Sequence, residues 1–127
     1  MCAVEAWHAR ATNVFPELMA DELAAVHESL YALFVELLPA VRIAHHQGDA
    51  ESLRHIYGFA RWCLDQPGDV SNAAAVAFYE HLFDDWQLRE AVTPWLTPRT
   101  VREIWTLWEA RLDQQQVRAL RQLLPSK

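Results

Sequence analysis

Apolar residues recur every three or four positions along much of this chain, and this spacing is what most constrains its fold. Leu30, Leu33, Phe34 and Leu37 show the pattern clearly, and on an α-helix it places the side chains on one face. No segment alternates apolar and polar residues, no Asn-Gly or Asp-Gly turn occurs, and the chain has only 3 glycines, so the usual strand and hairpin signals are missing. The sequence therefore predicts an all-α protein of six or seven helices.

The length and composition are those of one folded domain. The chain has 127 residues, of which 52% are apolar and 22% charged, and this balance excludes intrinsic disorder. We expect a single helical domain over residues 1–127. No apolar run is long enough for a membrane span, and the first residues show no signal peptide. Cys2 and Cys63 are too few for a disulfide framework, so the expected location is the reducing cytoplasm.

The chain is acidic, with a net charge of −6 from 11 Lys and Arg against 17 Asp and Glu. An acidic surface repels the phosphate backbone, so we do not expect nucleic acid as a partner. Opposite charge speeds the encounter of two proteins, so the expected partner is a protein with a basic surface. No motif indicates a cofactor, and the oligomeric state cannot be read from these residues.

Prolines, glycines and capping residues divide the chain into predicted helices. The predicted helices cover residues 3–11, 21–46 with an end or kink at Pro39, 49–66, 70–85, 87–92 and 97–124 with a bend or the start of a new helix near Asp113. The predicted N-caps are Asp21, Asp49, Asp69, Thr97 and Asp113, because a short polar side chain can accept a hydrogen bond from the first helical turn. Gly48 is the predicted stop of the second helix.

Residues 52–82 carry a more specific pattern. In SLRHIYGFARWCLDQPGDVSNAAAVAFYEHL, an Asp-Val pair opens the second predicted helix, and Ala73, Ala74 and Ala77 follow it. Small side chains let two helices approach closely. This stretch resembles a HEAT repeat, a pair of antiparallel helices with an Asp-Val near the start of the second. Ser71 departs from the repeat pattern, which usually has arginine there.

The layout of the whole chain resembles small bacterial HEAT/ARM-repeat-like proteins of unknown function. Some relatives of that group serve as immunity proteins against secreted toxins. The resemblance implies a compact stack of antiparallel helical hairpins, with the clearest pair over residues 49–86. It also implies a protein-interaction role, of which toxin neutralisation is one form.

The six histidines raise the question of a metal site. No HExxH, CxxC or Cys/His tetrad occurs, so no metal is predicted. His27 and His81 fall within or beside apolar stripes, where an imidazole needs a hydrogen-bond partner or must lose its charge. Two interpretations stay open: a core histidine satisfied by a neighbour, or a member of a candidate pocket with a catalytic or pH-sensing role.

Trp62 and the acidic group Glu80, Asp84 and Asp85 are the candidate partner-binding residues. Trp62 projects away from the apolar face of its helix, as an interface anchor would, and the alternative is packing beneath a terminal helix. Glu80 and Asp84 lie one turn apart, and the alternative for them is a solvated acidic edge. The sequence thus favours a non-enzymatic protein-interaction module. The alternative is a small enzyme or ligand-binding protein with a pocket near His81 and Glu80, and no catalytic residue is assigned.

Overall fold

The computed structural model describes residues 3–124, and side chains from residue 6 onward. Within this range the protein is all-helical, with seven α-helices and no strand, which confirms the predicted fold class. The α-helices are α1 (Ala3–Val14), α2 (Leu30–Gln47), α3 (Ala50–Leu64), α4 (Asp69–Ala77), α5 (Arg89–Val92), α6 (Pro98–Arg111) and α7 (Gln114–Leu123). The 3₁₀ helices are η1 (Ala25–His27), η2 (Tyr79–His81), η3 (Trp86–Leu88) and η4 (Thr93–Trp95).

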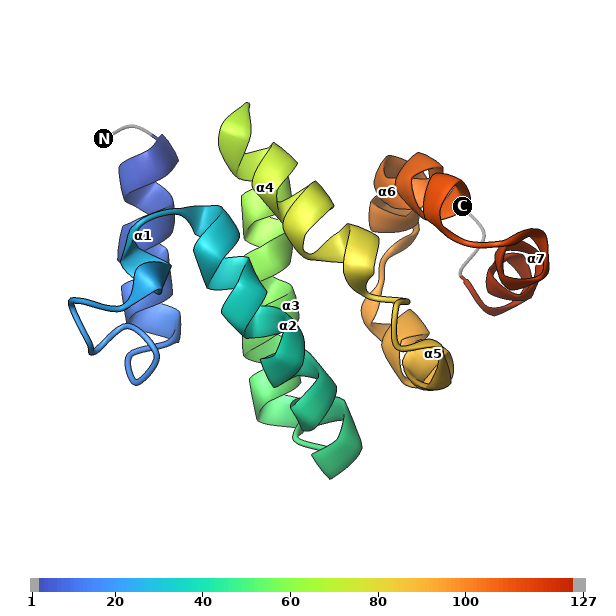
Figure 1. The fold of residues 1–127 in the computed structure, drawn as a ribbon, viewed down its shortest axis with the longest axis horizontal. Coiled ribbons are helices and arrows are strands. Elements are labelled where there is room, and N and C mark those ends of the chain that lie inside the picture. Colours follow the sequence, from blue (N-terminus) through green and yellow to red (C-terminus); the bar gives the residue numbers. More distant parts are fainter. Residues whose placement is uncertain (1–2, 125–127) are drawn as a thin grey trace.

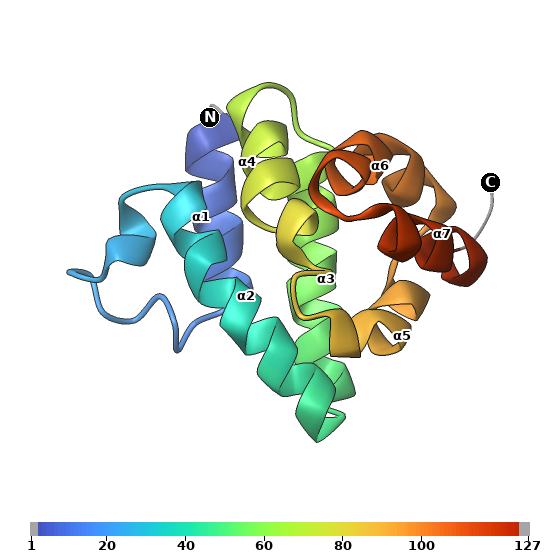
Figure 2. The ribbon, with the colours of Figure 1, turned by 45° about the vertical axis from the view of Figure 1, so that its right-hand side comes forward.

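Helices α2, α3 and α4 form the centre of the molecule (Figure 1). Helices α2 and α3 run side by side in opposite directions, and α4 packs against both. Helix α1 covers one side of this centre and contacts α3 and α4, while α5, α6 and α7 lie on the opposite side (Figures 1 and 2). Among residues 3–124, no helix is long and apolar enough to cross a membrane. The largest fully buried side chains are Trp108, Tyr79, Phe34, Phe59, Phe78 and Phe83.

Several predicted helix boundaries are confirmed by their capping geometry. The side chains of Asp49, Thr97 and Asp113 each accept a hydrogen bond from the backbone N–H three residues further on, as N-caps do. Gly48 ends α2 with a φ of 66°, a left-handed conformation that glycine adopts without a steric penalty. Each of these signals acts within one helical turn, which is why the sequence alone could show them.

The predicted N-cap at Asp21 is wrong. Helix α2 begins at Leu30, and Ser29 caps it by accepting a hydrogen bond from the backbone N–H of Ala32 at 3.0 Å. The preceding segment instead forms the turn of η1, and the ring of His27 lies 3.1 Å from the carbonyl oxygen of Met19. The contact between His27 and Met19 holds this segment against an earlier part of the chain. The helical spacing of its apolar residues therefore does not produce a continuous helix here.

Pro39 does not end α2, contrary to one of the two predicted outcomes. The helix continues through Pro39 to Gln47. Proline removes one N–H donor, so the carbonyl of Val35 loses its helical partner. Both Pro39 and Val35 are exposed, and water can satisfy the carbonyl that the proline leaves unbonded. The helix tolerates proline here because the lost hydrogen bond is on the solvent side.

The prediction of one helix over residues 70–85 is wrong beyond Ala77, where α4 ends and η2 follows. The break releases backbone carbonyls from the helical pattern, and a buried carbonyl needs a donor. The indole Nε1 of Trp108, on α6, donates to the carbonyl oxygen of Tyr79 at 2.7 Å. Since this donor comes from a distant helix, the local pattern of the sequence could not show the break.

The alanines of α4 make the close contact that their size predicts. Ala73 and Ala74 are 1% and 0% exposed, and α4 packs on both α2 and α3, whereas Ala77 is half-buried. The predicted N-cap at Asp69 is wrong, because Gly68 is the N-cap and its φ of 66° suits glycine. The HEAT or ARM repeat character of this helix pair is not confirmed and stays a prediction.

Candidate interaction site

The structure brings the carboxylates of Glu80 and Asp84 together around a cation. Arg111, the last residue of α6, donates hydrogen bonds to both carboxylate oxygens of Asp84, at 2.7 and 2.9 Å, and its Nη1 lies 3.6 Å from Glu80. Nδ1 of His81 lies 2.8 Å from Asp84. Partial burial raises the pKa of Asp84, but the hydrogen bonds from Arg111 and His81 outweigh it and hold this pKa below its ordinary value. Asp85 is half-buried at the start of η3.

The negative charge of the acidic edge formed by Glu80, Asp84 and Asp85 is therefore partly neutralised by Arg111. The two paired members of this edge connect the turn after α4 to the end of α6. Arg111, which is 27 positions from Asp84, was not predicted as part of this region. No periodic signal links residues at that separation, so only the fold could show the pairing.

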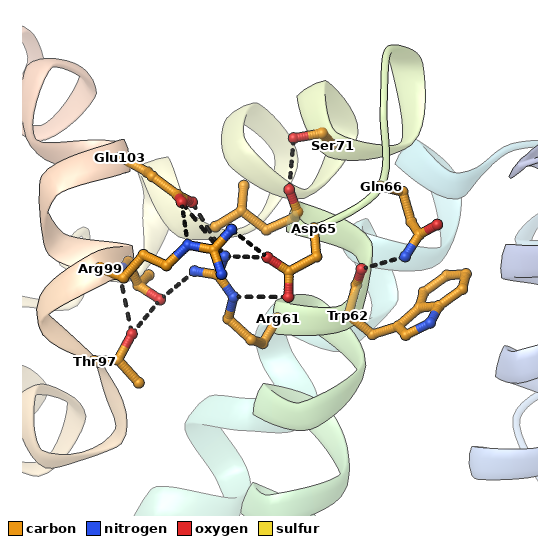
Figure 3. Close-up of polar contacts among 10 residues, drawn as sticks. Arg61, Trp62, Asp65, Gln66, Ser71, Thr97, Arg99 and Glu103 are labelled. Atoms are coloured by element: carbon orange, nitrogen blue, oxygen red, sulfur yellow. Dashed lines mark hydrogen bonds and ion pairs between the residues drawn. The ribbon is translucent and has the colours of Figure 1, made fainter.

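Trp62 is half-buried beneath α1. The guanidinium carbon of Arg10 lies 4.5 Å from the centre of its ring, and Phe59 stacks beside it with ring centres 6.4 Å apart. Figure 3 shows Trp62 on the side of α3 that is turned away from α6. The position of Trp62 therefore agrees better with packing beneath a terminal helix than with a freely exposed interface anchor.

A network of ion pairs joins α3 to α6 (Figure 3). Arg61 of α3 pairs with Asp65 and with Glu103 of α6, at 3.3 Å for the latter, and donates to the hydroxyl of Thr100 at 2.7 Å. Arg99 of α6 lies 3.1 Å from Asp65 and 3.0 Å from Glu103. The hydrogen bond to Asp65 raises the pKa of Arg61 and outweighs the effect of burial. The charges in this network are balanced, and its ion pairs link the end of α3 to α6.

The two histidines of the candidate pocket are not brought together. Nε2 of His27 lies 3.1 Å from the carbonyl oxygen of Met19, and Nδ1 lies 2.7 Å from Nε2 of His8. His8 and His27 line a hollow of about 390 Å³ between α1 and the starts of α2 and α4. His81 does not line this hollow and instead contacts Asp84 of the acidic edge. The geometry of His27 is that of a histidine satisfied by its neighbours.

The described residues offer little for metal or nucleophilic chemistry. Among residues 3–124, no group of three or more His, Cys, Asp and Glu is placed to hold a metal ion. Cys63 is fully buried, and burial raises its pKa to about 12, so it carries no appreciable thiolate at neutral pH. Cys2 lies outside the described residues.

A larger hollow, of about 680 Å³, lies where residues 14–18 pass beside the second half of α2 and the first half of α3. We call it the α2–α3 hollow. Its floor is formed by the buried side chains of Leu37, Ala44 and Ile56. The apolar surface that a ligand can reach comes from the half-buried Phe15, Leu18 and Ala40 and the exposed Ile43. Four acidic residues also line it, and we call them the rim carboxylates: Glu17, Glu36, Asp49 and Glu51.

The rim carboxylates are not balanced by ion pairs. Glu17, Glu36 and Glu51 form no ion pair with any residue in the described part of the chain. Asp49 accepts hydrogen bonds from the hydroxyl and backbone N–H of Ser52, at 2.7 and 3.2 Å, which lower its pKa and keep it ionised. The hollow therefore combines an apolar floor with a negative rim, an arrangement that suits recognition of a charged, partly apolar ligand.

Helix α2 presents a row of exposed apolar side chains beside this hollow. Val35 and Ile43 are 63% and 55% exposed, and with Pro39 they recur every four residues along the solvent side of the helix. Tyr31, four residues before Val35, turns instead toward α4, where its hydroxyl accepts a hydrogen bond from Asn72 at 2.8 Å. Ile43 also lines the α2–α3 hollow. Single exposed apolar residues are common on proteins, but a row that continues into a hollow is typical of a binding surface. The spacing was visible in the sequence, yet only the fold shows that this side is uncovered.

These features define an all-helical protein with an acid-rimmed apolar hollow on its surface. The chain belongs to the family described as "Domain of unknown function (DUF7674)", which matches residues 8–125. No curated protein and no solved structure matches the chain at a significant level. The family assignment names no repeat or immunity protein, so that part of the resemblance is not confirmed.

Proposed function

We propose that this chain is a non-enzymatic protein-interaction module, formed by a single helical domain, that docks a partner protein at the α2–α3 hollow. The observation that carries the proposal is the hollow itself, with its apolar floor, its rim carboxylates and the exposed side chain of Ile43. Covering a half-exposed isoleucine stabilises a complex by about 1 kcal/mol. Several such contacts in one hollow are needed for specific binding.

Toxin neutralisation, as in immunity proteins, is one concrete form of this proposal. It is supported by the resemblance of the chain's layout to small bacterial HEAT/ARM-repeat-like proteins and by the acidic charge, which suits a basic toxin surface. We also propose a cytoplasmic location in a bacterium, which the low cysteine count and the resemblance support. Trp62 and the acidic edge remain candidates for a secondary contact area, with less support because α1 and Arg111 already engage them.

The alternative is a small enzyme or ligand-binding protein that works near His81 and Glu80. One observation favours it: the hydrogen bond between His81 and Asp84, since a carboxylate that orients an imidazole is typical of general bases. However, Arg111 engages the same carboxylate, so the cluster is also explained as a contact between the turn after α4 and α6. The interaction module is therefore the better-supported function.

The proposal can be tested by site-specific photocrosslinking in cells of the source organism. A photoreactive residue replaces Ile43 in one variant and Leu123, an exposed residue on α7, in the matched control. We expect a partner protein to crosslink at position 43 and not at position 123. The purified partner should then bind the Ile43→Ser variant at least tenfold more weakly. Equal crosslinking at both positions, none at position 43, or an unchanged affinity would overturn docking at the hollow.

A further inference from the structure

We propose that the segment bound in the α2–α3 hollow is a basic amphipathic helix of the partner protein. This inference rests on the proposed function and adds the chemistry of the bound segment. Apolar side chains on one face of that helix would enter the hollow, and Lys or Arg side chains on its flanks would pair with the rim carboxylates. Docking of a helix in a groove is a recurrent mode of peptide recognition.

The size of the hollow fits several side chains of one segment. Its volume of about 680 Å³ lies within the range of small-ligand pockets, and the hollow is open to solvent and not enclosed. Its buried floor residues, Leu37, Ala44 and Ile56, belong to two helices that are packed together. The apolar side chains that a ligand can reach lie around this floor and include Ala40 and Ile43, so they favour a ligand that presents its own apolar side chains.

A helical ligand fits this surface better than an extended one. The described residues include no strand, so an extended peptide would find no sheet edge to satisfy its backbone groups. A helix satisfies its own backbone. The exposed row on α2 runs from Val35 to Ile43, which is about 12 Å at the rise of an α-helix. A partner helix needs at least two turns to cover it.

The charges around the hollow favour a basic helix. The residues that line it include the four rim carboxylates and His55, and no Lys or Arg of the described chain is among them. The positive charge of Arg54, on α3, also lowers the pKa of Asp49, but its effect is the smallest of several. The negative rim therefore remains available to cations, and pairing with them would be favourable when the contact excludes water.

Pro39 adds a polar feature to the same surface. Because proline has no N–H, the carbonyl of Val35 lacks its helical donor, and both residues are exposed. A Lys or Arg side chain of the partner can donate a hydrogen bond to this carbonyl. A cationic side chain is a strong donor to such a carbonyl, so this acceptor is compatible with the class of ligand that the rim favours.

Charge also argues against a second copy of this chain as the occupant. A two-fold contact through α2 would bring two sets of rim carboxylates close together. Each copy carries a net charge of −6, which adds long-range repulsion. A different, basic protein avoids both penalties.

The experiment uses the full chain and three designed peptides of about 18 residues. The first is an amphipathic Leu/Lys helix, the second has the same composition with a scrambled order, and the third is the corresponding Leu/Glu helix. Binding is measured by fluorescence anisotropy at low and high salt. We expect the amphipathic Leu/Lys peptide to bind at least tenfold more tightly than the other two, and salt to weaken its binding.

Two charge-matched variants test whether the binding occurs at the rim. The Glu36→Gln, Glu51→Gln double variant removes two rim carboxylates, and the Glu28→Gln, Glu90→Gln variant removes two exposed carboxylates elsewhere. Both change the net charge equally. We expect the rim variant to bind the Leu/Lys peptide at least fivefold more weakly and the control to change by less than twofold. Circular dichroism confirms that both variants are folded.

Other results would overturn the inference in distinguishable ways. Equal loss in both variants would mean that the peptide responds to the overall charge and not to the hollow. A dimer that forms at micromolar concentration and is disrupted by Ile43→Ser would identify a second copy as the occupant. A partner crosslinked at position 43 through an acidic or non-helical segment would disprove the inference and leave the proposed function intact. Rim-dependent peptide binding without any crosslinked partner would support the hollow's chemistry and disprove the proposed function.

Discussion

Two acidic regions of this protein use their carboxylates differently. At the acidic edge after α4, Asp84 receives two hydrogen bonds from Arg111, and Glu80 lies near the same guanidinium. At the α2–α3 hollow, Glu36 and Glu51 have no cationic partner among the described residues. A carboxylate paired within the molecule contributes to the fold, whereas one without a partner keeps its charge for a ligand. The two regions thus differ in whether the protein itself neutralises their charge, and under the proposed function the unpaired carboxylates are the ones that meet a ligand.

The two acidic regions are expected to differ in whether they affect stability or binding. Substitutions around the acidic edge and its supporting contacts should change the free energy of unfolding. Substitutions at the rim should leave it nearly unchanged and affect binding instead. A rim substitution that lowers the free energy of unfolding more than an acidic-edge substitution would contradict this distinction.

The largest effect is expected for Trp108→Phe, next to the acidic edge. Trp108 is fully buried and donates to the carbonyl of Tyr79, so the variant leaves a buried acceptor without its donor and creates a small cavity. We expect a loss of about 1–3 kcal/mol in the free energy of unfolding, measured by urea denaturation. Trp105→Phe is the matched control, because Trp105 is half-buried and its ring packs against Arg121. Equal losses in the two variants would show that the hydrogen bond does not stabilise the break after α4.

Gly48→Ala should cost about 1 kcal/mol, because residue 48 has a φ of 66° and fixes the turn that leads to Asp49 at the rim. No atom lies within 4 Å of an added Cβ, so the penalty comes from the backbone alone. Gly58→Ala is the opposite control. Gly58 is exposed within α3 and has equal space for a Cβ, so alanine should stabilise by about 0.5–1 kcal/mol. Thermal denaturation of both variants measures the difference, and a change of the same sign in both would contradict this explanation.

Asp84→Asn should reduce stability by less than about 1 kcal/mol at pH 7, because solvent screens this partly exposed ion pair. The pKa of Asp84 is lowered in the folded protein. Its stabilising effect is therefore complete above the unfolded pKa of about 4 and is lost as the pH falls through the lower folded value. Urea denaturation of parent and variant between pH 7 and pH 2 measures this effect. A difference that stays constant over that range would show that the charge of Asp84 is not involved.

The smallest effect is expected for the Glu36→Gln, Glu51→Gln double variant. Both side chains are exposed and form no ion pair within the described residues, so the free energy of unfolding should change by less than about 0.5 kcal/mol. Urea denaturation beside the parent protein measures this value. A loss above 1 kcal/mol would mean that these carboxylates support the fold, and the contrast with the acidic edge would disappear.

Much of the secondary structure could be predicted because its signals are local. Asp49, Thr97 and Asp113 occupy N-cap positions, and Gly48 ends α2. Each of these residues acts on backbone groups within about one turn, so its effect depends little on the rest of the chain. The failures are also informative. The predicted cap at Asp21 obeyed the same rule, but the segment after it is held in a different turn through His27.

The candidate site was only partly predictable. The acidic edge was identified from its carboxylates, but its cation, Arg111, was not, because 27 positions separate Arg111 from Asp84. The α2–α3 hollow was missed altogether. Its lining comes from three segments of the chain, and no single segment carries a signal for a shared cavity. The exposure of Ile43 likewise depends on which neighbours fail to cover it.

The sequence by itself determined the helical class, most helix ends and the acidic character of this protein. Helical periodicity, capping and net charge are properties of short segments or of the composition, and they need no knowledge of distant contacts. Only the tertiary structure decided where α4 breaks, which carboxylates are paired and where a hollow remains. These features depend on contacts such as that between Trp108 and Tyr79, which are 29 positions apart. Packing selects such contacts from many that are compatible with the same local pattern, because the buried polar groups and apolar faces of all the helices must be satisfied at once.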